Sequence, residues 1–291
     1  MRLITFLHNG QLRLGAFRPD TNDTSLVDLN RADSHLPDTM LAFIEAGEAT
    51  LILAQQILAA PPPAAIVDRA AVTVKAPIPR PGKIICIGLN YRDHAAEANL
   101  PLPPFPVVFA KYANVVIGPG EAIVLPKISQ QVDYEAEFGV VIGKRARAVP
   151  EAEALNYVAG YVPFHDVSAR DYQNRTSQWS IGKTFDTFGP MGPALVTADE
   201  IPDPHTLNIR LLIGDEVLQS SNTRNLIFSV PHLVADLSAV MTLEPGDVIA
   251  TGTPGGVGFA RKPQRFLQPG DRVRIEIERL GVLENPVVAE A

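Results

Sequence analysis

The sequence predicts a β-rich α+β protein in which a small N-terminal unit precedes a larger domain. Short runs of β-forming residues alternate with Gly- and Pro-containing turns over most of the chain, and clear helical patterns are few. Strands and helices do not alternate regularly, so neither a Rossmann fold nor an α/β barrel is expected. The 291 residues are enough for a main domain and a small additional one.

A small N-terminal α/β domain is predicted over residues 1–75, ahead of the larger domain at 76–291. Apolar residues alternate on both sides of Asn9-Gly10. This dipeptide tolerates positive φ at both central turn positions, so the segment predicts a β-hairpin. The Pro-rich stretch 76–82 is typical of an extended linker between the two domains.

A long helix is predicted in the N-terminal domain, from Thr39 to about Ala60. Apolar residues recur there at helical spacing, and Asp38 can serve as the N-cap. The three prolines at 61–63 cannot continue a helix and therefore end it.

The larger domain contains several β-rich runs and two helical patterns. Strands are expected at residues 83–88, 107–111, 131–143, 207–213, 248–251 and 272–277, and helices at 151–157 and 229–241.

Composition restricts the classes of function. The formal net charge of -7 argues against a nucleic-acid-binding protein, which normally has a basic face. No stretch approaches the roughly 20 apolar residues of a membrane span, and the apolar run after Met1 is too short for a signal peptide. Cys86, the only cysteine, lies in an apolar run and is expected to be inert packing. A cytoplasmic protein that binds neither nucleic acid nor membrane is therefore expected.

Acidic residues alternate with apolar ones in the segment 132–143. A strand there would place Asp133, Glu135 and Glu137 on one face. Like charges on one face repel, so either the face is solvated or a cation lies between the carboxylates. A second acid-rich stretch, 164–173, favours the cation. Carboxylates without associated Cys or paired His suit Mg²⁺ or Mn²⁺, with Ca²⁺ as a further option.

The chain resembles the fumarylacetoacetate hydrolase family from about residue 83 to residue 288. Five stretches occur in the order that the family has, namely residues 88–97, 133–137, 166–171, 183–186 and 251–258. The resemblance implies a mixed β-sandwich roll, a homodimer, and a metal ion held by Glu135, Glu137 and Asp166. The first domain resembles the small N-terminal domain of many bacterial members.

Asn90 departs from the family members that have a fourth oxygen ligand, because those carry an aspartate near this position. The chain is therefore closer to the three-carboxylate branch, which contains acylpyruvate hydrolases, oxaloacetate decarboxylases and dienoate isomerases. This resemblance implies a small 2-oxo or diketo acid as the substrate, rather than fumarylacetoacetate itself.

Cleavage of a C–C bond between two carbonyls needs an activated water and an electron sink. These two requirements indicate the catalytic residues. His94 and Glu97 are spaced i, i+3, so on a short helix they face the same way. Glu97 can then orient His94 while His94 takes a proton from the water. Asn90, with Asp93 three residues on, is expected to cap this helix.

Five more residues complete the predicted site. Lys183 is expected to stabilise an oxyanion in the acidic site, or to pair with a neighbouring acid. Arg170 and Gln173 are expected to bind substrate oxygens. Thr253, in a Gly-rich loop, offers a hydroxyl and N–H groups to a carboxylate. Tyr91 is assigned to the substrate by its place in the first family stretch.

Together these residues predict a metal-dependent hydrolase that cleaves a 2,4-dioxo acid, such as an acylpyruvate or fumarylpyruvate. Two alternatives use the same metal and Lys183 without an attacking water. They are the decarboxylation of oxaloacetate and the isomerisation of a 2-hydroxy-dienedioate. A non-catalytic protein that binds a metal or a metabolite is a remote third alternative.

Overall fold

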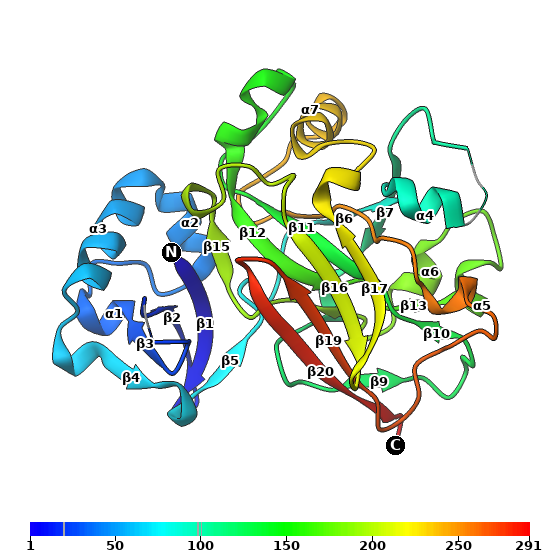
Figure 1. Ribbon diagram of the computed structural model, residues 1–291. Coiled ribbons are helices and arrows are strands. Elements are labelled where there is room, and N and C mark those ends of the chain that lie inside the picture. Colours follow the sequence, from blue (N-terminus) through cyan, green and yellow to red (C-terminus); the bar gives the residue numbers. More distant parts are fainter. Residues whose placement is uncertain (20, 98, 100) are drawn as a thin grey trace.

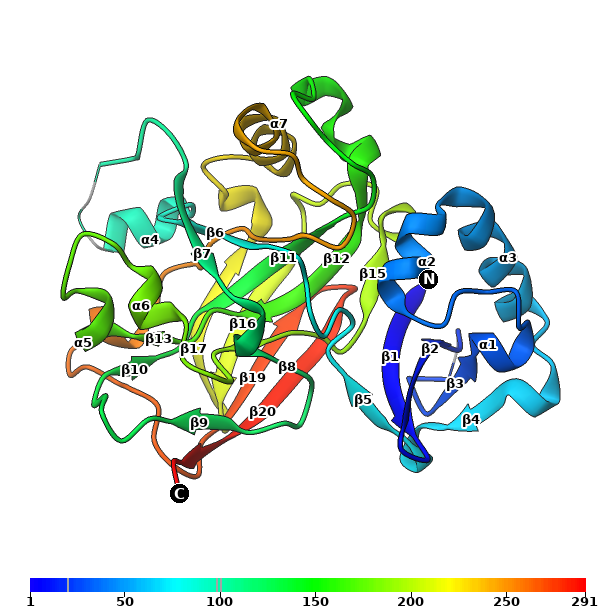
Figure 2. The same cartoon turned by 180° about the vertical axis from the view of Figure 1, so that it is seen from behind.

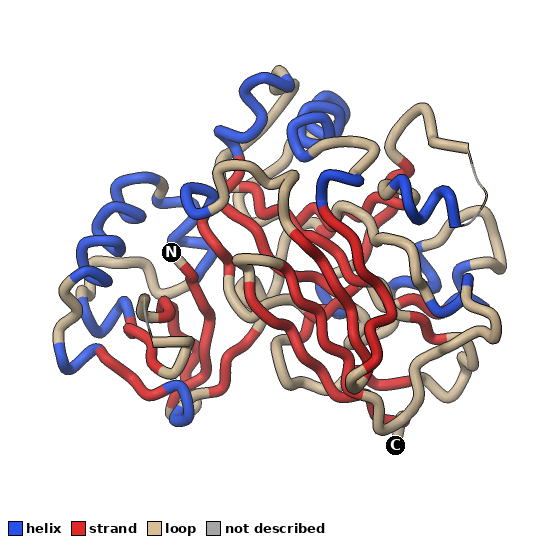
Figure 3. The backbone as a smooth tube through the Cα atoms, viewed as in Figure 1, coloured by secondary structure: helices blue, strands red, loops and turns tan. Residues whose placement is uncertain are grey.

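A computed structural model describes the whole chain except residues 20, 98 and 100. The fold is α+β and dominated by sheets, as the sequence predicts, and the helices are short and lie at the periphery (Figure 1, Figure 3). The N-terminal residues form a distinct lobe beside a larger sandwich of two sheets.

The predicted N-terminal hairpin is confirmed. Strands β1 (Arg2–His8) and β2 (Gln11–Phe17) pair antiparallel through a two-residue turn. Asn9 and Gly10 in that turn have φ values of 50° and 78°. Both values lie in the left-handed region that Asn and Gly tolerate, which is why this dipeptide sets the register of the hairpin.

One large sheet runs through both parts of the chain. Its strand order is β4-β3-β2-β1-β15-β12-β11-β18-β6-β7, and β5 also pairs with β1. The strands beyond the hairpin are β3 (Ser25–Asp28), β4 (Ile66–Asp68), β5 (Thr73–Lys75), β6 (Ile84–Gly88), β7 (Val107–Lys111), β11 (Ala136–Ile142), β12 (Val158–His165), β15 (Leu195–Thr197) and β18 (Val248–Ala250). Because β1 pairs with β15, the first residues extend the sheet of the larger domain. The domain boundary at residue 75 stays a prediction.

A second sheet covers one face of the first. Its order is β17-β16-β19-β20-β9, from β9 (Ile123–Leu125), β16 (Asn208–Ile213), β17 (Glu216–Asn222), β19 (Arg272–Ile277) and β20 (Gly281–Ala289). This sheet lies in front of β11 and β12 in Figure 1 and behind them in Figure 2. Inward-facing apolar side chains of both sheets are fully buried, and Phe138 stacks on Tyr161 with ring centroids 5.0 Å apart.

The remaining elements are short. They are the strands β8 (Val116–Ile117), β10 (Val132–Asp133), β13 (Ser168–Ala169) and β14 (Gly189–Pro190), the helices α1 (Leu29–Ala32), α4 (Arg92–Glu97), α5 (Arg170–Gln173), α6 (Ser180–Lys183) and α7 (Val230–Val240), and the 3₁₀ helices η1 (Pro63–Ala65), η2 (Arg69–Ala71), η3 (Ala113–Val115), η4 (Glu151–Tyr157), η5 (Ala198–Glu200), η6 (Thr223–Asn225) and η7 (Gly258–Ala260). The helix predicted at 229–241 is confirmed as α7, with Ser229 as its N-cap, whereas the predicted helix at 151–157 is a 3₁₀ helix.

The single helix predicted from Thr39 to Ala60 is wrong. The segment forms α2 (Met40–Ala46) and α3 (Glu48–Ala59), bent by 115° at Gly47, which has φ 76° and ψ −155°. This conformation is accessible essentially only to glycine and ends α2. The N-cap is also one residue later than predicted, since the Thr39 side chain accepts from the amide of Ala42.

Among the residues that the structure describes, no single helix is long and apolar enough to cross a membrane. The bent pair α2 and α3 reaches that length and composition only when both helices are counted together. Both helices bury apolar residues within the lobe, including Met40, Phe43, Ala54 and Leu58.

The break at Gly47 is testable by adding one methyl group. Gly47→Ala should lower the free energy of unfolding by about 1–3 kcal/mol, because alanine is strained at this φ and ψ. An added Cβ would meet no atom within 4 Å, so the loss would come from the backbone alone. Urea denaturation measures the change, with exposed Glu45→Ala as the control on the preceding helix. An unchanged midpoint for Gly47→Ala would contradict the argument.

Candidate metal centre and active site

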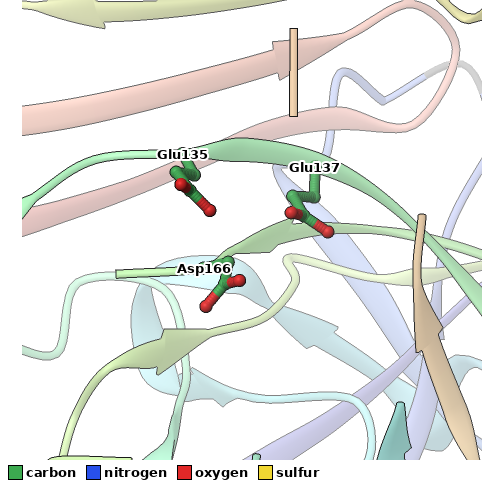
Figure 4. A group of neighbouring side chains, drawn as sticks. All are labelled: Glu135, Glu137 and Asp166. Atoms are coloured by element: carbon green, nitrogen blue, oxygen red, sulfur yellow. The ribbon is translucent and has the colours of Figure 1, made fainter. Parts of the chain in front are cut away.

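Three buried carboxylates converge where β11 and β12 meet. Glu137 lies on β11, Glu135 just before its first residue, and Asp166 just after the last residue of β12. Antiparallel pairing of Ala136 with His165 brings the two strand ends together. One oxygen from each acid lies within 4.8 Å of the others, and the three side chains lie next to one another (Figure 4). The three ligands named from the family resemblance thus form one group.

The backbone holds two of these acids in place. The amide of Asp166 donates to the carbonyl of Glu135 at 3.0 Å, so the two residues are joined by main chain as well as by strand pairing. A displacement of either carboxylate would require the ladder between β11 and β12 to shift. The group is therefore preorganised by the central strands of the large sheet.

The single strand predicted over residues 131–143 is wrong, and so is the common face for its three acids. β10 ends at Asp133, and β11 begins at Ala136, while β10 pairs with β13 instead of β12. Asp133 accepts hydrogen bonds from the amides of Gly258 and Phe259 at 2.8 and 3.0 Å. It anchors the Gly-rich loop and is not part of the three-acid group.

Three buried cations face the acids. Lys183 Nζ lies 2.8 Å from both Glu135 Oε2 and Asp166 Oδ2. Arg170 bridges Asp133 and Glu135 through Nε and Nη2, at 2.8 and 2.6 Å. Burial alone would raise the pKa of Glu135, but the charges of Lys183 and Arg170 hold it well below its usual range. The pairing of Lys183 with metal-site acids is thus the second of the two roles expected for it.

Lys111 is the third cation, and the sequence prediction missed it. It ends the edge strand β7 with its side chain fully buried, and its ammonium binds Asp166 Oδ1 and the carbonyl of Val167. Both oxygens of Asp166 are therefore held by lysines. The available signal was the alternation along β7, which places Lys111 on the same side as Phe109, toward the interior.

Glu137 is the acid without a cation of its own among the described residues. Its carboxylate accepts one hydrogen bond, from the amide of Gly252 at 2.9 Å. Burial and the nearby carboxylates of Asp166 and Glu135 raise the pKa of Glu137 well above its usual range.

The charges around the site do not balance. Among the residues that the structure describes, Asp133, Glu135, Glu137 and Asp166 oppose only Lys111, Arg170 and Lys183. An uncompensated buried carboxylate is unfavourable, and a divalent cation between the three acids would stabilise it. The all-oxygen donor set suits Mg²⁺ or Mn²⁺. The residues present therefore fit a divalent cation.

His94 and Glu97 lie on the same short helix, α4, as expected. Nδ1 of His94 is 3.5 Å from Glu97 Oε2, and His94 faces the pocket. The other contact of Glu97 is the amide of Gly256, which donates to its carboxylate at 3.0 Å. His94 and Gly256 together lower the pKa of Glu97, so the carboxylate is charged and able to orient the imidazole.

The predicted capping of α4 by Asn90 is wrong. The Asn90 side chain donates to the carbonyls of Thr251 and Phe228 at 2.8 and 3.2 Å and accepts from the amide of Phe228 at 2.8 Å. It therefore ties the start of α4 to β18 and to the loop before α7. Asp93 accepts from Ser221 Oγ and from the amide of His94.

These groups surround one small cavity of ≈ 70 Å³. Its polar lining consists of His94, Glu135, Glu137, Arg170, Gln173, Lys183 and Thr253, and its apolar lining consists of Ile87, Leu89, Phe109 and Trp179, with Gly88 between two of them. The structure thus brings seven of the predicted site residues to one cavity, and it adds Trp179 and Phe109, which the sequence prediction did not include.

Arg170 and Thr253, which were expected to contact the substrate, instead hydrogen-bond to other protein groups. All three guanidinium nitrogens of Arg170 are occupied by protein, the third by Gln173 Oε1 at 2.9 Å. Arg170 therefore positions Glu135, while Gln173 lines the cavity and its role as a substrate contact stays a prediction. The Thr253 hydroxyl donates to Ala136 and accepts from Gln219. It positions the strand start that carries Glu135.

Three buried residues lie behind the cavity wall. The Tyr91 hydroxyl has no hydrogen-bond partner among the described residues, and burial raises its pKa. Tyr91 does not line the cavity, so its assignment to the substrate stays a prediction. Burial lowers the pKa of His165 to about 3, so the ring is neutral at physiological pH. Burial also raises the pKa of Cys86, consistent with the inert packing role expected for it.

The chain is similar to known proteins over most of its length. The sequence pattern described as "Fumarylacetoacetate (FAA) hydrolase C-terminal" matches residues 83–288. The chain is 49% identical over 269 residues to a mitochondrial oxaloacetate tautomerase from Bos taurus, covering 92% of this chain and 85% of that protein.

Two solved structures share the fold over the full length of both chains. One is a fumarylacetoacetate hydrolase from Exiguobacterium antarcticum, with a TM-score of 0.85 and 34% identity. The other is a maleylpyruvate hydrolase from Sphingobium sp. SYK-6 in complex with manganese(II) and pyruvate, with a TM-score of 0.81 and 34% identity.

The uncompensated charge of Glu137 is testable by an isosteric change. Removing a residue that hydrogen-bonds to a metal ligand typically weakens metal binding by about 10–100-fold. Glu137→Gln changes a ligand itself, so it should weaken Mn²⁺ binding by at least about 100-fold. Calorimetric titration measures this affinity. Because the variant removes an unbalanced buried charge, the Tm of the metal-free protein should stay the same or rise.

The matched control is Glu45→Gln, an exposed acid on α2 that should leave Mn²⁺ binding and Tm unchanged. Retention of wild-type Mn²⁺ affinity by Glu137→Gln would show that the ion, if bound, does not use this carboxylate.

Proposed function

The chain belongs to the fumarylacetoacetate hydrolase family and is an enzyme, and we propose that it interconverts the enol and keto forms of a short 2-oxo acid such as oxaloacetate. The observation that carries the proposal is a small cavity lined by Glu135, Glu137, Lys183 and His94, where Asp166 completes the group of three acids. The identity of 49% with a protein named oxaloacetate tautomerase supports this choice of reaction within the family.

The three acids would hold a divalent cation, Mg²⁺ or Mn²⁺, that acts as a Lewis acid toward the substrate's carboxylate and 2-oxygen. A neighbour of the same fold binds manganese together with pyruvate, which is itself a 2-oxo acid. The three-carboxylate group of this chain supports the same kind of ion, and the choice between Mg²⁺ and Mn²⁺ is part of the proposal.

Lys183 stabilises the oxygen on C2 of the substrate. Glu135 and Asp166 hold its ammonium in place, and although burial would lower its pKa, these two acids hold it above its usual value. The group therefore stays charged, and it donates a hydrogen bond to O2 as negative charge develops there. The cavity is small, and the ammonium is already in place before charge develops on the substrate, so little reorganisation is needed.

His94 moves the proton at C3. In the enol-to-keto direction the proton on O2 leaves to solvent, and the oxygen electron pair forms the C2=O double bond. The electrons of the C2=C3 double bond then form a new C3–H bond with a proton from the His94 ring. Solvent returns a proton to His94, so the proton count balances and no water is consumed. The Glu97 carboxylate, 3.5 Å from Nδ1, orients the imidazole ring.

A second candidate is hydrolysis of a 2,4-dioxo acid. The specific observation in its favour is the His94–Glu97 pair at the cavity, which can activate a water as readily as it can transfer a proton to carbon. The maleylpyruvate hydrolase with the same fold supports this candidate too. A homodimeric assembly and a cytoplasmic location stay predictions from the sequence.

Loss of the His94 imidazole should separate chemistry from binding. His94→Ala is expected to slow ketonisation of enol-oxaloacetate by about 100- to 10,000-fold, the usual contribution of a general acid–base residue. The enol is followed by its ultraviolet absorbance in the presence of Mn²⁺, with the uncatalysed rate subtracted. Mn²⁺ affinity should be unchanged, because His94 is not among the three acids.

His35→Ala is the matched control, since His35 is an exposed surface histidine whose loss should not alter the rate. A wild-type protein that leaves the enol unchanged but cleaves 2,4-dioxopentanoate, with water oxygen entering the products, would replace the tautomerase by the hydrolase. An active His94→Ala variant would remove His94 from either mechanism.

A further inference from the structure

We propose that Trp179 is the specificity-determining wall of the cavity and limits the substrate to 2-oxo acids of about four carbons. This inference rests on the proposed function in one respect, that a 2-oxo acid occupies this cavity. It adds an upper limit on the carbon-chain length of that acid. Trp179 is the only tryptophan of the chain, and its side chain lines the same cavity as Glu135, Glu137 and Lys183.

Helix α6 sets the distance between the wall and the reactive end. Trp179 is the N-cap residue of α6, and its φ of −81° and ψ of −24° are helical. Lys183 is the last residue of α6, four positions on, so both side chains lie on one side of the helix. Four residues correspond to a rise of roughly 6 Å along the axis. The indole therefore lies about one helical turn from the ammonium, and we expect a substrate bound at Lys183 to extend toward it.

Phe109 fills the stretch of wall between these two residues. Its ring centroid lies 5.0 Å from Lys183 Nζ and 5.6 Å from the Trp179 ring centroid, in an edge-to-face arrangement with the indole. Cation, phenyl ring and indole thus follow one another along one side of the cavity. The substrate atoms beyond C3 face aromatic carbon on that side.

The indole lies in close contact with the backbone of β6 on one side. It packs against Gly88 so closely that an added Cβ there would lie 2.4 Å from Trp179 Cζ3. Helix α6 is fixed as well, since a Cβ on Gly182 would lie 2.3 Å from the backbone nitrogen of Gln173. The two glycines therefore let the ring and the helix lie directly against neighbouring backbone. A longer acid would have to displace the indole from this contact.

The test measures binding and needs no turnover. Affinities of the Mn²⁺-loaded protein for pyruvate, 2-oxobutanoate, 2-oxopentanoate and 2-oxohexanoate are compared by calorimetry. In the wild type we expect the affinity to fall about tenfold or more between 2-oxobutanoate and 2-oxohexanoate. A methylene group that a pocket cannot accommodate has an effect of at least this size. In Trp179→Ala the two affinities should agree within about threefold. Ile181→Ala, an exposed residue of the same helix, should keep the wild-type difference.

Wild-type affinities that do not depend on length would overturn the inference, and so would a Trp179→Ala variant that keeps the wild-type difference. A second measurement uses the unmodified protein, in case the variant does not fold. Because Trp179 is the only tryptophan, its fluorescence should change when 2-oxobutanoate is added to the Mn²⁺-loaded protein. Unchanged emission at saturation would place the ligand elsewhere.

These outcomes are distinct from failure of the proposed function. A protein that shows the length limit but does not convert enol-oxaloacetate would contradict the proposed tautomerase activity and keep the role of Trp179. A protein that converts enol-oxaloacetate but shows no length limit would keep the activity and contradict the role of Trp179.

Discussion

Four carboxylates are buried against three cations at the centre of a β-sandwich, and the rest of the site depends on that imbalance. Water is largely excluded there, so each carboxylate needs a hydrogen bond or an opposite charge. Asp133 and Glu135 share Arg170, and Asp166 lies between Lys111 and Lys183. Glu137 receives only a backbone amide. A divalent cation at the three acids compensates this charge and at the same time creates an electrophile for a 2-oxo acid.

The fold makes this arrangement rigid. The ladder between β11 and β12 fixes Glu135, Glu137 and Asp166 relative to one another, and the second sheet covers the opposite face. Helices α5 and α6 are too short to be stable alone, yet they deliver Arg170 and Lys183 because Gly182 lets their backbones touch. The reactive groups are thus held by strands and close packing.

The sequence predicted those parts of the site that depend on local pattern or on the family resemblance. The hairpin at Asn9-Gly10 follows from two adjacent residues, and the His94–Glu97 pair follows from helical spacing. The metal ligands were named from the resemblance, and the structure brings them together.

Long-range contacts account for what the sequence did not predict. Lys111 approaches Asp166 only because β7 is the edge strand beside β6, and Asp133 leaves the acid face because its short strand pairs with β13. Gly47 looked like one more residue in an apolar periodic segment, although its backbone conformation ends a helix. Trp179 is separated by seventy residues from Phe109, so no local signal linked them to one cavity.

The central claim, that the unbalanced acid group is a divalent-cation site, is tested most directly by anomalous diffraction from crystals grown with Mn²⁺ and recorded above the manganese absorption edge. One strong anomalous peak should lie within bonding distance of an oxygen from each of Glu135, Glu137 and Asp166. A map without a peak there, or with manganese bound only to other carboxylates, would contradict the account and leave the buried charge of Glu137 to be compensated by protonation.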